Sequence, residues 1–250
     1  MNLRDTPPER LYREFAGLWA LMSPPEDYAA EAAHWRFLLR KHLGPGRHSL
    51  LDLGVGGGHH LSHLAGEFAV TGIDLSPDML AQCRRLIPGA ELHAGDMRSL
   101  RLDRTFDAVL AHDAINHMLS PDDLRAAFRT AAAHLRPNGL FLASPERFLG
   151  EFQSPEVETA THSDGATTFT YFQYDCLLHP ESAVVDTFLT YVIQTADGVR
   201  IEHDRMQAGL FSRATWRRLL KETGFSVETR SFPLPGWPRP YELLVGTLRS

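Results

Sequence analysis

Hydrophobic residues at intervals of three and four open the chain. This spacing predicts a short amphipathic helix over residues 9–22, with apolar positions Leu11, Phe15, Leu18 and Trp19. The pair Pro24-Pro25 ends that helix. A second helix is predicted from Glu26 to Leu43, where the breaker Gly44-Pro45-Gly46 follows.

From residue 49 onward, apolar runs alternate with amphipathic segments. Strands are predicted at 49–55, 70–76, 91–96, 106–114 and 140–145. Ser76 and Pro77 are typical of a helix start, and a helix from about Pro121 to Leu135 is expected to stop at residues 136–139. Strand–helix alternation of this kind predicts a parallel sheet covered by helices on both faces.

The pattern changes near residue 150. Residues 167–207 are rich in Thr, Val, Tyr and Phe, and turn signals at 179–182 and 197–198 predict three antiparallel strands. A helix over 212–224 and strands at 225–232 and 241–248 close the chain. Three parts are therefore expected: an N-terminal helical arm (1–45), an α/β core (46–149 with 209–250) and an antiparallel β insertion (150–208).

Composition excludes several classes of protein. The chain has 250 residues, of which 43% are hydrophobic, and a net charge of −6. An acidic chain without a dense Lys/Arg run is not expected to bind nucleic acid. The two distant cysteines, Cys83 and Cys176, indicate neither a zinc module nor a disulfide framework. The charged N-terminus is not typical of a secretory signal, and no apolar run reaches the roughly 20 residues of a membrane helix, so a cytoplasmic protein without a membrane partner is expected.

The most specific motif is glycine-rich. Asp52-Leu53-Gly54-Val55-Gly56-Gly57-Gly58 lies at the end of the first predicted strand, where glycines permit a sharp turn and the close approach of a ligand. The dinucleotide fingerprint G-x-G-x-x-G requires a glycine at position 59, and this chain has His59. A structural turn without a ligand and a nucleotide site of another kind remain open for the D-x-G-x-G-x-G spacing.

Carboxylates follow at the next two strand ends. Asp74 ends the second predicted strand, where an acidic residue can accept both hydroxyl groups of a ribose. Helix capping is the alternative role for Asp74, but Ser76 already fills that position. Asp96 follows the third strand. The series Asp52, Asp74 and Asp96 therefore predicts one ligand site along the edge of the sheet.

Together these motifs resemble those of class I S-adenosylmethionine-dependent methyltransferases. Residues 113–117 resemble the acceptor loop of small-molecule N-methyltransferases, including enzymes that dimethylate amino sugars, and the resemblance covers roughly residues 25–145. It implies a Rossmann-like doubly wound sheet, mostly parallel with an antiparallel last strand, and an antiparallel insertion after the fifth strand. It also implies S-adenosylmethionine as cofactor, S-adenosylhomocysteine as product and a small-molecule acceptor, an amine or a hydroxyl.

Individual roles follow from the same resemblance. Asp96 is expected to accept from the adenine amine, and the arm is expected to cover the cofactor. His117, with His112 as second candidate, is the expected catalytic base near neutral pH. The insertion is expected to cover the acceptor or to build a homodimer. The implied cofactor-binding residues are Tyr12, Tyr28, Asp52, Gly54, Gly56, Gly58, Asp74, Leu75, Met79, Asp96, Met97 and His112.

The same motifs allow four other interpretations. A nicotinamide-dependent oxidoreductase is disfavoured by His59 and by Asp96-Met97. A non-catalytic S-adenosylmethionine-binding protein remains an alternative, because the acceptor side is not diagnostic. An RNA methyltransferase is disfavoured by the acidic balance. His59, His60 and His63 lie near one another in sequence, but no acidic ligand accompanies them, so no metal is expected.

Overall fold

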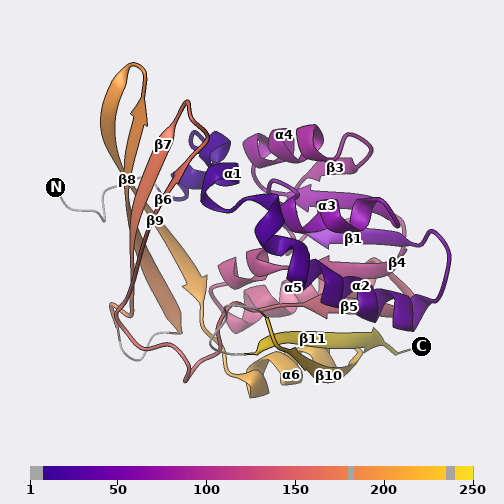
Figure 1. Cartoon of the computed structure of the whole chain (residues 1–250). Coiled ribbons are helices and arrows are strands. Elements are labelled where there is room, and N and C mark those ends of the chain that lie inside the picture. The colour runs from indigo at the N-terminus through magenta and orange to yellow at the C-terminus, as the bar shows by residue number, and fades with distance from the viewer. Residues whose placement is uncertain (1–7, 180–182, 235–239, 250) are drawn as a thin grey trace.

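Two separate β-sheets organise the computed structural model, which describes residues 8–179, 183–234 and 240–249. Sheet A has seven strands in the order β10-β11-β5-β4-β1-β2-β3, and sheet B has four in the order β6-β7-β8-β9. Figure 1 shows sheet B standing beside sheet A, with the N-terminal arm between them. Among the described residues, no helix is long and apolar enough to cross a membrane.

Sheet A is the predicted doubly wound sheet. Strands β1 to β5 pair in parallel, whereas β11 runs antiparallel to both β5 and β10. The fold class expected from the sequence, including the antiparallel last strand, is confirmed. The strands are β1 (Ser49–Leu53), β2 (Ala69–Asp74), β3 (Glu91–Ala94), β4 (Phe106–Ala111), β5 (Leu135–Ala143), β10 (Phe225–Phe232) and β11 (Tyr241–Leu248).

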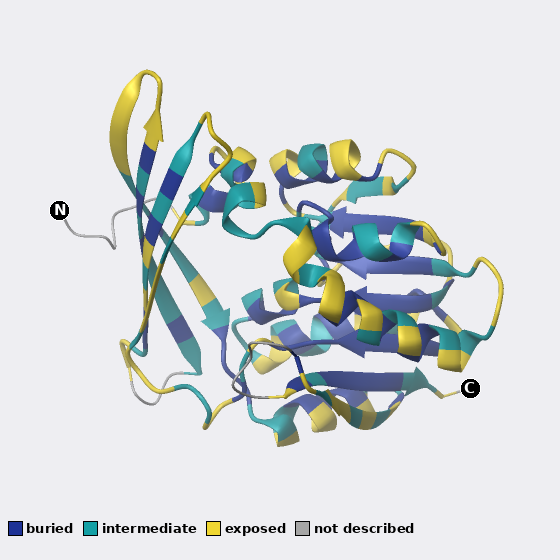
Figure 2. Ribbon diagram, in the orientation of Figure 1, coloured by how far each residue is buried: buried dark blue, intermediate teal, exposed yellow. Residues whose placement is uncertain are grey.

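Both faces of sheet A are buried, because successive side chains of each strand point to opposite sides. Leu50 packs on the side of α2 (Ala29–Leu43), α3 (His59–Ala65) and α4 (Pro77–Leu86). Leu51 packs on the side of α5 (Pro121–Ala133) and α6 (Arg213–Glu222). Figure 2 shows the strands as a buried layer between helices whose outer surfaces are exposed. The predicted stop at 136–139 instead forms the irregular start of β5, where the pairing with β4 shifts register.

Sheet B corrects the prediction for the insertion. It contains β6 (Glu156–Ser163), β7 (Thr168–Cys176), β8 (Val184–Thr195) and β9 (Gly198–Gly209), one strand more than predicted. The sequence of β6 is polar and mostly exposed, so it lacks the apolar run that marked the other strands. Residues 180–182 of the predicted turn at 179–182 lie outside the described residues.

The arm also differs from its prediction. Residues 9–22 form short 3-10 turns, η2 (Arg10–Tyr12) and η3 (Ala16–Leu18), and one helical turn, α1 (Trp19–Met22), instead of a continuous helix. The backbone N–H groups of Arg10 and Leu11 donate to the carboxylate of Asp204 on β9, at 3.0 and 2.7 Å. Leu11 and Phe15 are buried against sheet B, so tertiary contacts override the helical spacing. The second predicted helix is divided into η4 (Pro25–Tyr28) and α2.

Candidate functional site

A glycine bend connects β1 to α3 at the carboxyl edge of sheet A. Gly54, Gly56 and Gly58 have φ values of 83°, 53° and 82°, a region that residues with a Cβ rarely adopt. A Cβ on Gly54 would lie 2.3 Å from the Cβ of Ala114 and 2.9 Å from Cε of Met97. The bend is therefore held directly against the segment after β4, and only glycine fits at position 54.

Asp74, at the end of β2, fixes the shape of this bend. Its Oδ2 accepts from the N–H of Gly56 and its Oδ1 accepts from the N–H of Ser76, both at 2.8 Å. Burial raises the pKa of Asp74, and these backbone donors oppose that rise. Each oxygen keeps a further lone pair, so the carboxylate can hold the bend and still accept from ligand hydroxyls.

Asp52 lies below the bend with an unsatisfied carboxylate. It is 3% exposed, and its Oδ1 has no hydrogen-bond partner among the described residues. Burial raises the pKa of Asp52 to about 7, although the neighbouring His112 lowers it. A buried acceptor without a donor is costly, so this oxygen is suited to a donor group from a ligand or a water.

His112, directly after β4, is buried between two carboxylates. Its Nε2 lies 2.7 Å from Oε2 of Glu31, and its Nδ1 lies 3.3 Å from Oδ2 of Asp113. Burial opposes protonation, but Asp113 and Glu31 outweigh it and raise the pKa of His112 to about 9. His60 stacks on this ring with centroids 4.6 Å apart, and burial lowers the pKa of His60 well below its usual range. Both ring nitrogens of His112 face carboxylates, which favours the charged form of the ring.

The arm lies over the bend and is bound to it by polar contacts. The hydroxyl of Ser76 donates to the carbonyl oxygen of Tyr12. His59 and His63, on α3, form hydrogen bonds with the carbonyl oxygens of Ser23 and Pro25, both at 2.7 Å. Two of the three histidines considered for a metal thus attach the arm to the core.

The remaining cofactor candidates divide into buried and exposed side chains. Met79 and Met97 are buried beside Gly56 and Gly54, respectively. Leu75 is 67% exposed directly after Asp74. Both oxygens of Asp96 accept from the guanidinium of Arg98, which lowers the pKa of Asp96. An adenine amine at Asp96 would therefore share that carboxylate with Arg98.

His117 lies on the other side of the bend, at the end of η5 (Asp113–His117). Its ring contacts Tyr12 edge-on, with centroids 5.5 Å apart, and its Nδ1 lies 3.8 Å from Oε1 of Glu9. Burial raises the pKa of Tyr12. Four neighbouring groups act in the same direction: Tyr28, Glu9, Asp113 and Glu146. His117 and these carboxylates therefore lie near Tyr12, where the arm meets η5.

Three residues near this site are not among the site residues predicted from the sequence: Glu31, Glu146 and Asn116. Glu31 had a usable signal, because it falls on the apolar stripe of α2 with Trp35 and Leu39, where a carboxylate is unusual. Asn116 also had a signal, because it falls in residues 113–117, which resemble the acceptor loop. Glu146 had none, because its position depends on how the segment after β5 packs against η5 and sheet B.

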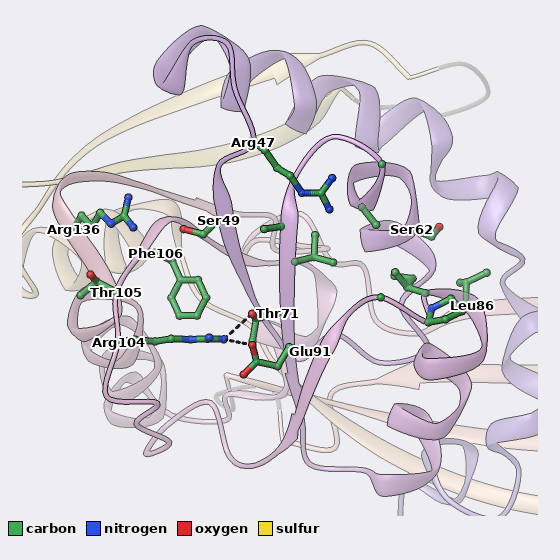
Figure 3. A pocket seen from close by; sticks show the side chains of 17 residues that line it. Arg47, Ser49, Ser62, Thr71, Leu86, Glu91, Arg104, Thr105, Phe106 and Arg136 are labelled. Atoms are coloured by element: carbon green, nitrogen blue, oxygen red, sulfur yellow. Dashed lines mark hydrogen bonds and ion pairs between the residues drawn. The ribbon is translucent and has the colours of Figure 1, made fainter.

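A separate cavity lies at the opposite edge of sheet A. It has a volume of about 640 Å³ and is lined at the amino ends of the strands by residues including Ser49, Thr71 and Phe106. Figure 3 shows Arg104 in this cavity bound to Thr71 and Glu91. Ligands of open α/β sheets bind at the carboxyl ends of the strands, so this cavity is not the candidate site.

Comparisons with known proteins agree with this geometry. A methyltransferase-domain family model matches residues 50–139. The chain is 36% identical over 224 residues to the dTDP-3-amino-3,6-dideoxy-alpha-D-glucopyranose N,N-dimethyltransferase of Streptomyces fradiae, covering 88% of this chain and 85% of that protein. The crystal structure of Streptomyces venezuelae DesVI matches with a TM-score of 0.82 and 30% identity over 94% of this chain and 98% of that one.

A structure with bound S-adenosylmethionine also matches. CalS10, an amino pentose methyltransferase from Micromonospora echinaspora, has a TM-score of 0.78 and 28% identity, over 94% of this chain and 96% of its own. The expected methyltransferase activity, its cofactor S-adenosylmethionine and a small-molecule acceptor are thus confirmed, against the nicotinamide alternative. The chain belongs to the class I S-adenosylmethionine-dependent methyltransferases, in the group of the amino-sugar N-methyltransferases.

Proposed function

We propose that this enzyme methylates the amino group of a deoxyamino sugar carried on a nucleotide such as dTDP, and that it does so twice. The relative from Streptomyces fradiae is named for that reaction and aligns over 88% of this chain. The observation that carries the proposal is a group of acidic side chains around Tyr12, where the charges of Asp113 and Glu146 both act on the phenol. We call Tyr12, Asp113 and Glu146 the acidic recess.

The recess is suited to an amine. Desolvation raises the pKa of Glu146 to about 7, and the nearby charges of Asp113 and Asp175 act in the same direction. The charge of Arg147 opposes this rise. Burial also raises the pKa of Asp113. The side chains of Asp113 and Glu146 are 52% and 51% exposed, so both carboxylates are accessible to a ligand. Two neighbouring carboxylates attract a cation, and an amino sugar reaches the enzyme largely as its ammonium. A hydroxyl acceptor would gain nothing from this charge.

The cofactor fits the edge of the bend. Asp74 would accept from the ribose hydroxyls, and the unsatisfied Oδ1 of Asp52 would accept from a donor of the methionine end. The buried cation His112 would balance the charge of that end. Exposed Leu75, with Met79, Met97 and Asp96, would hold the adenine, while Tyr12 and Tyr28 of the arm would close the site. When bound, S-adenosylmethionine supplies a methyl group made electrophilic by its sulfonium.

A residue on the acceptor side must remove protons from the amine. The amine must lose a proton before it can act as a nucleophile, and it must lose another before a second methylation. His117 is proposed to take this proton on an imidazole nitrogen, because it borders the recess and its side chain is 31% exposed. His112 is proposed to remain charged and to orient groups without exchanging protons.

A methyl-transfer assay tests the function. S-adenosylhomocysteine release is measured with a dTDP-linked amino sugar, the corresponding sugar bearing a hydroxyl in place of the amine, and a simple phenol. We expect release only with the amino sugar, and mass spectrometry should detect mono- and dimethylated products in sequence. Equal release with the hydroxyl sugar would contradict an amine-selective site.

We also propose that the enzyme is a cytoplasmic homodimer that acts on a small molecule. The outward face of sheet B exposes Val157, Phe172, Val199 and Ile201, and a second copy of this chain is its proposed partner. Both cysteines, Cys83 and Cys176, are free, which agrees with a cytoplasmic enzyme. The acidic balance supports a small molecule over nucleic acid as the acceptor.

A further inference from the structure

A small polar cavity opens between the core and sheet B, next to the acidic recess. Its volume is about 50 Å³, enough for one polar group of a ligand or a few waters, but too small for a sugar ring. Its polar lining comes from η5, from the segment after β5, and from β7 and β8. These residues are Asn116, Glu146, Arg147, Gln173, Asp175 and Thr187.

Most of this lining is already hydrogen-bonded. Asp175 accepts from the hydroxyl of Thr187 at 2.6 Å, from Gln173 at 3.0 Å and from Arg147 at 3.3 Å. Arg147 also lies 3.2 Å from Glu146 and 3.1 Å from Glu156. The internal network therefore fixes the wall formed by sheet B.

Asn116 is the exception. Its residue is 7% exposed, its Oδ1 accepts from the backbone N–H of Glu146 at 3.3 Å, and its Nδ2 has no partner among the described residues. A backbone N–H can only donate, so it fixes the carboxamide with the oxygen toward Glu146. The amide nitrogen is thus a buried donor without an acceptor, at the edge of a cavity that can admit one.

We propose that this cavity binds the hydroxyl group on the carbon that is next to the amine-bearing carbon and farther from the nucleotide, which is the 4-hydroxyl of a 3-amino sugar, and that Nδ2 of Asn116 donates to its oxygen. The inference rests on the proposed function and adds a selection between amino sugars. While the amine lies in the recess with Glu146, the adjacent hydroxyl enters the cavity. An acceptor lacking that hydroxyl leaves the donor unsatisfied.

The test compares two acceptors that differ in one group. These are dTDP-3-amino-3,6-dideoxy-glucose, which has a 4-hydroxyl beside its amine, and the same compound without the 4-hydroxyl. For the wild-type enzyme we expect kcat/KM to be about 10- to 100-fold higher with the hydroxyl compound, because a water can partly replace the missing group. In Asn116→Ala the ratio of the two kcat/KM values should fall to near one.

Two further variants separate recognition from structure. Asn116→Leu keeps a side chain of similar size but can neither donate to the hydroxyl nor accept from it, so it should also bring the ratio to near one. Gln194→Ala removes an exposed carboxamide on β8 and should preserve it. Calorimetric binding of S-adenosylhomocysteine confirms that each variant is folded.

The outcomes are distinct. A wild-type enzyme that uses both sugars equally, or a ratio that survives in both Asn116 variants, overturns the inference and leaves the proposed function standing. A wild-type enzyme that neither binds nor methylates either sugar overturns both.

Discussion

The cofactor side and the acceptor side of this site are built in different ways. Asp52, Asp74 and Asp96 lie at the ends of three successive strands, and the bend beside them is shaped by backbone contacts such as the 2.8 Å bond from Gly56 to Asp74. The acceptor side joins the arm, η5, the segment after β5 and sheet B, with contacts such as Arg10 to Asp204 across 194 positions. One side is therefore a local motif, and the other depends on tertiary packing.

This difference predicts where each side is sensitive to change. The cofactor side should fail when the backbone geometry of the bend is altered. The acceptor side should tolerate loss of single contacts but change its selectivity or rate.

The largest effect is expected from Gly54→Ala. The added Cβ would meet Ala114 at 2.3 Å in a backbone with φ of 83°, so we expect a loss of about 2–6 kcal/mol in the free energy of unfolding and no measurable cofactor binding. Denaturant unfolding and calorimetry check this. Gly165→Ala is the matched control, because its φ is 90° and no atom lies within 4 Å of the added Cβ, so strain alone should cost about 1–2 kcal/mol.

Glu31→Gln is expected to destabilise the cofactor side in a pH-dependent way. The pKa of His112 is raised to about 9, above its unfolded value, so its stabilisation is complete below about pH 6.5 and is lost as the pH rises through 9. The Glu31→Gln substitution should lower the free energy of unfolding by about 3 kcal/mol at pH 7 and by much less at pH 10. Urea unfolding at both pH values measures this. Glu67→Gln is the exposed control, and it should lower the free energy of unfolding by less than about 1 kcal/mol at either pH. If Glu31→Gln lowered this free energy equally at pH 7 and pH 10, the charged pair of Glu31 and His112 would be contradicted.

The sequence predicted the cofactor side of the molecule better than the acceptor side. Sheet A was predictable because its strands are short apolar runs between helices, and parallel strands bring Asp52 and Asp74 to one edge. The helix over 9–22 was wrong because Asp204, far along the chain, binds the backbone N–H groups of the arm. Strand β6 was missed because it has no apolar run. Asn116 lies in the loop that the resemblance identified, but its contact with the backbone of Glu146 depends on tertiary packing and could not be predicted from a local pattern.

His117→Ala tests the acceptor side. We expect kcat to fall about 100-fold, because a proposed proton acceptor is lost. Cofactor affinity should change far less, because the ring of His117 packs edge-on against Tyr12 and its Nδ1 lies 3.8 Å from Oε1 of Glu9. Steady-state kinetics and calorimetry with S-adenosylhomocysteine measure the two quantities. An undiminished kcat at neutral pH would assign deprotonation to another group or to water.

Asp74→Ala should give the reverse pattern. The lost ribose contacts and the loosened bend should weaken S-adenosylmethionine binding about 10- to 100-fold in calorimetry. Asp107→Ala is the control at the amino edge of sheet A, where Asp107 accepts from Ser49 at 2.8 Å, and it should lower stability without changing cofactor affinity. Wild-type affinity in Asp74→Ala would show that the site has been placed at the wrong strand ends.

The smallest effect on activity is expected on the outer face of sheet B. The inner face carries Phe169 and Tyr191, packed on the arm, whereas Ile201 is 62% exposed on the opposite face. Because a strand alternates its side chains, a charge at position 201 leaves the inner face intact. Ile201→Glu should therefore convert the proposed dimer to a monomer in light scattering while kcat/KM changes by no more than about twofold. An unchanged mass would mean that the copies do not pair through this face, and a collapse of activity would mean that pairing also shapes the acceptor side.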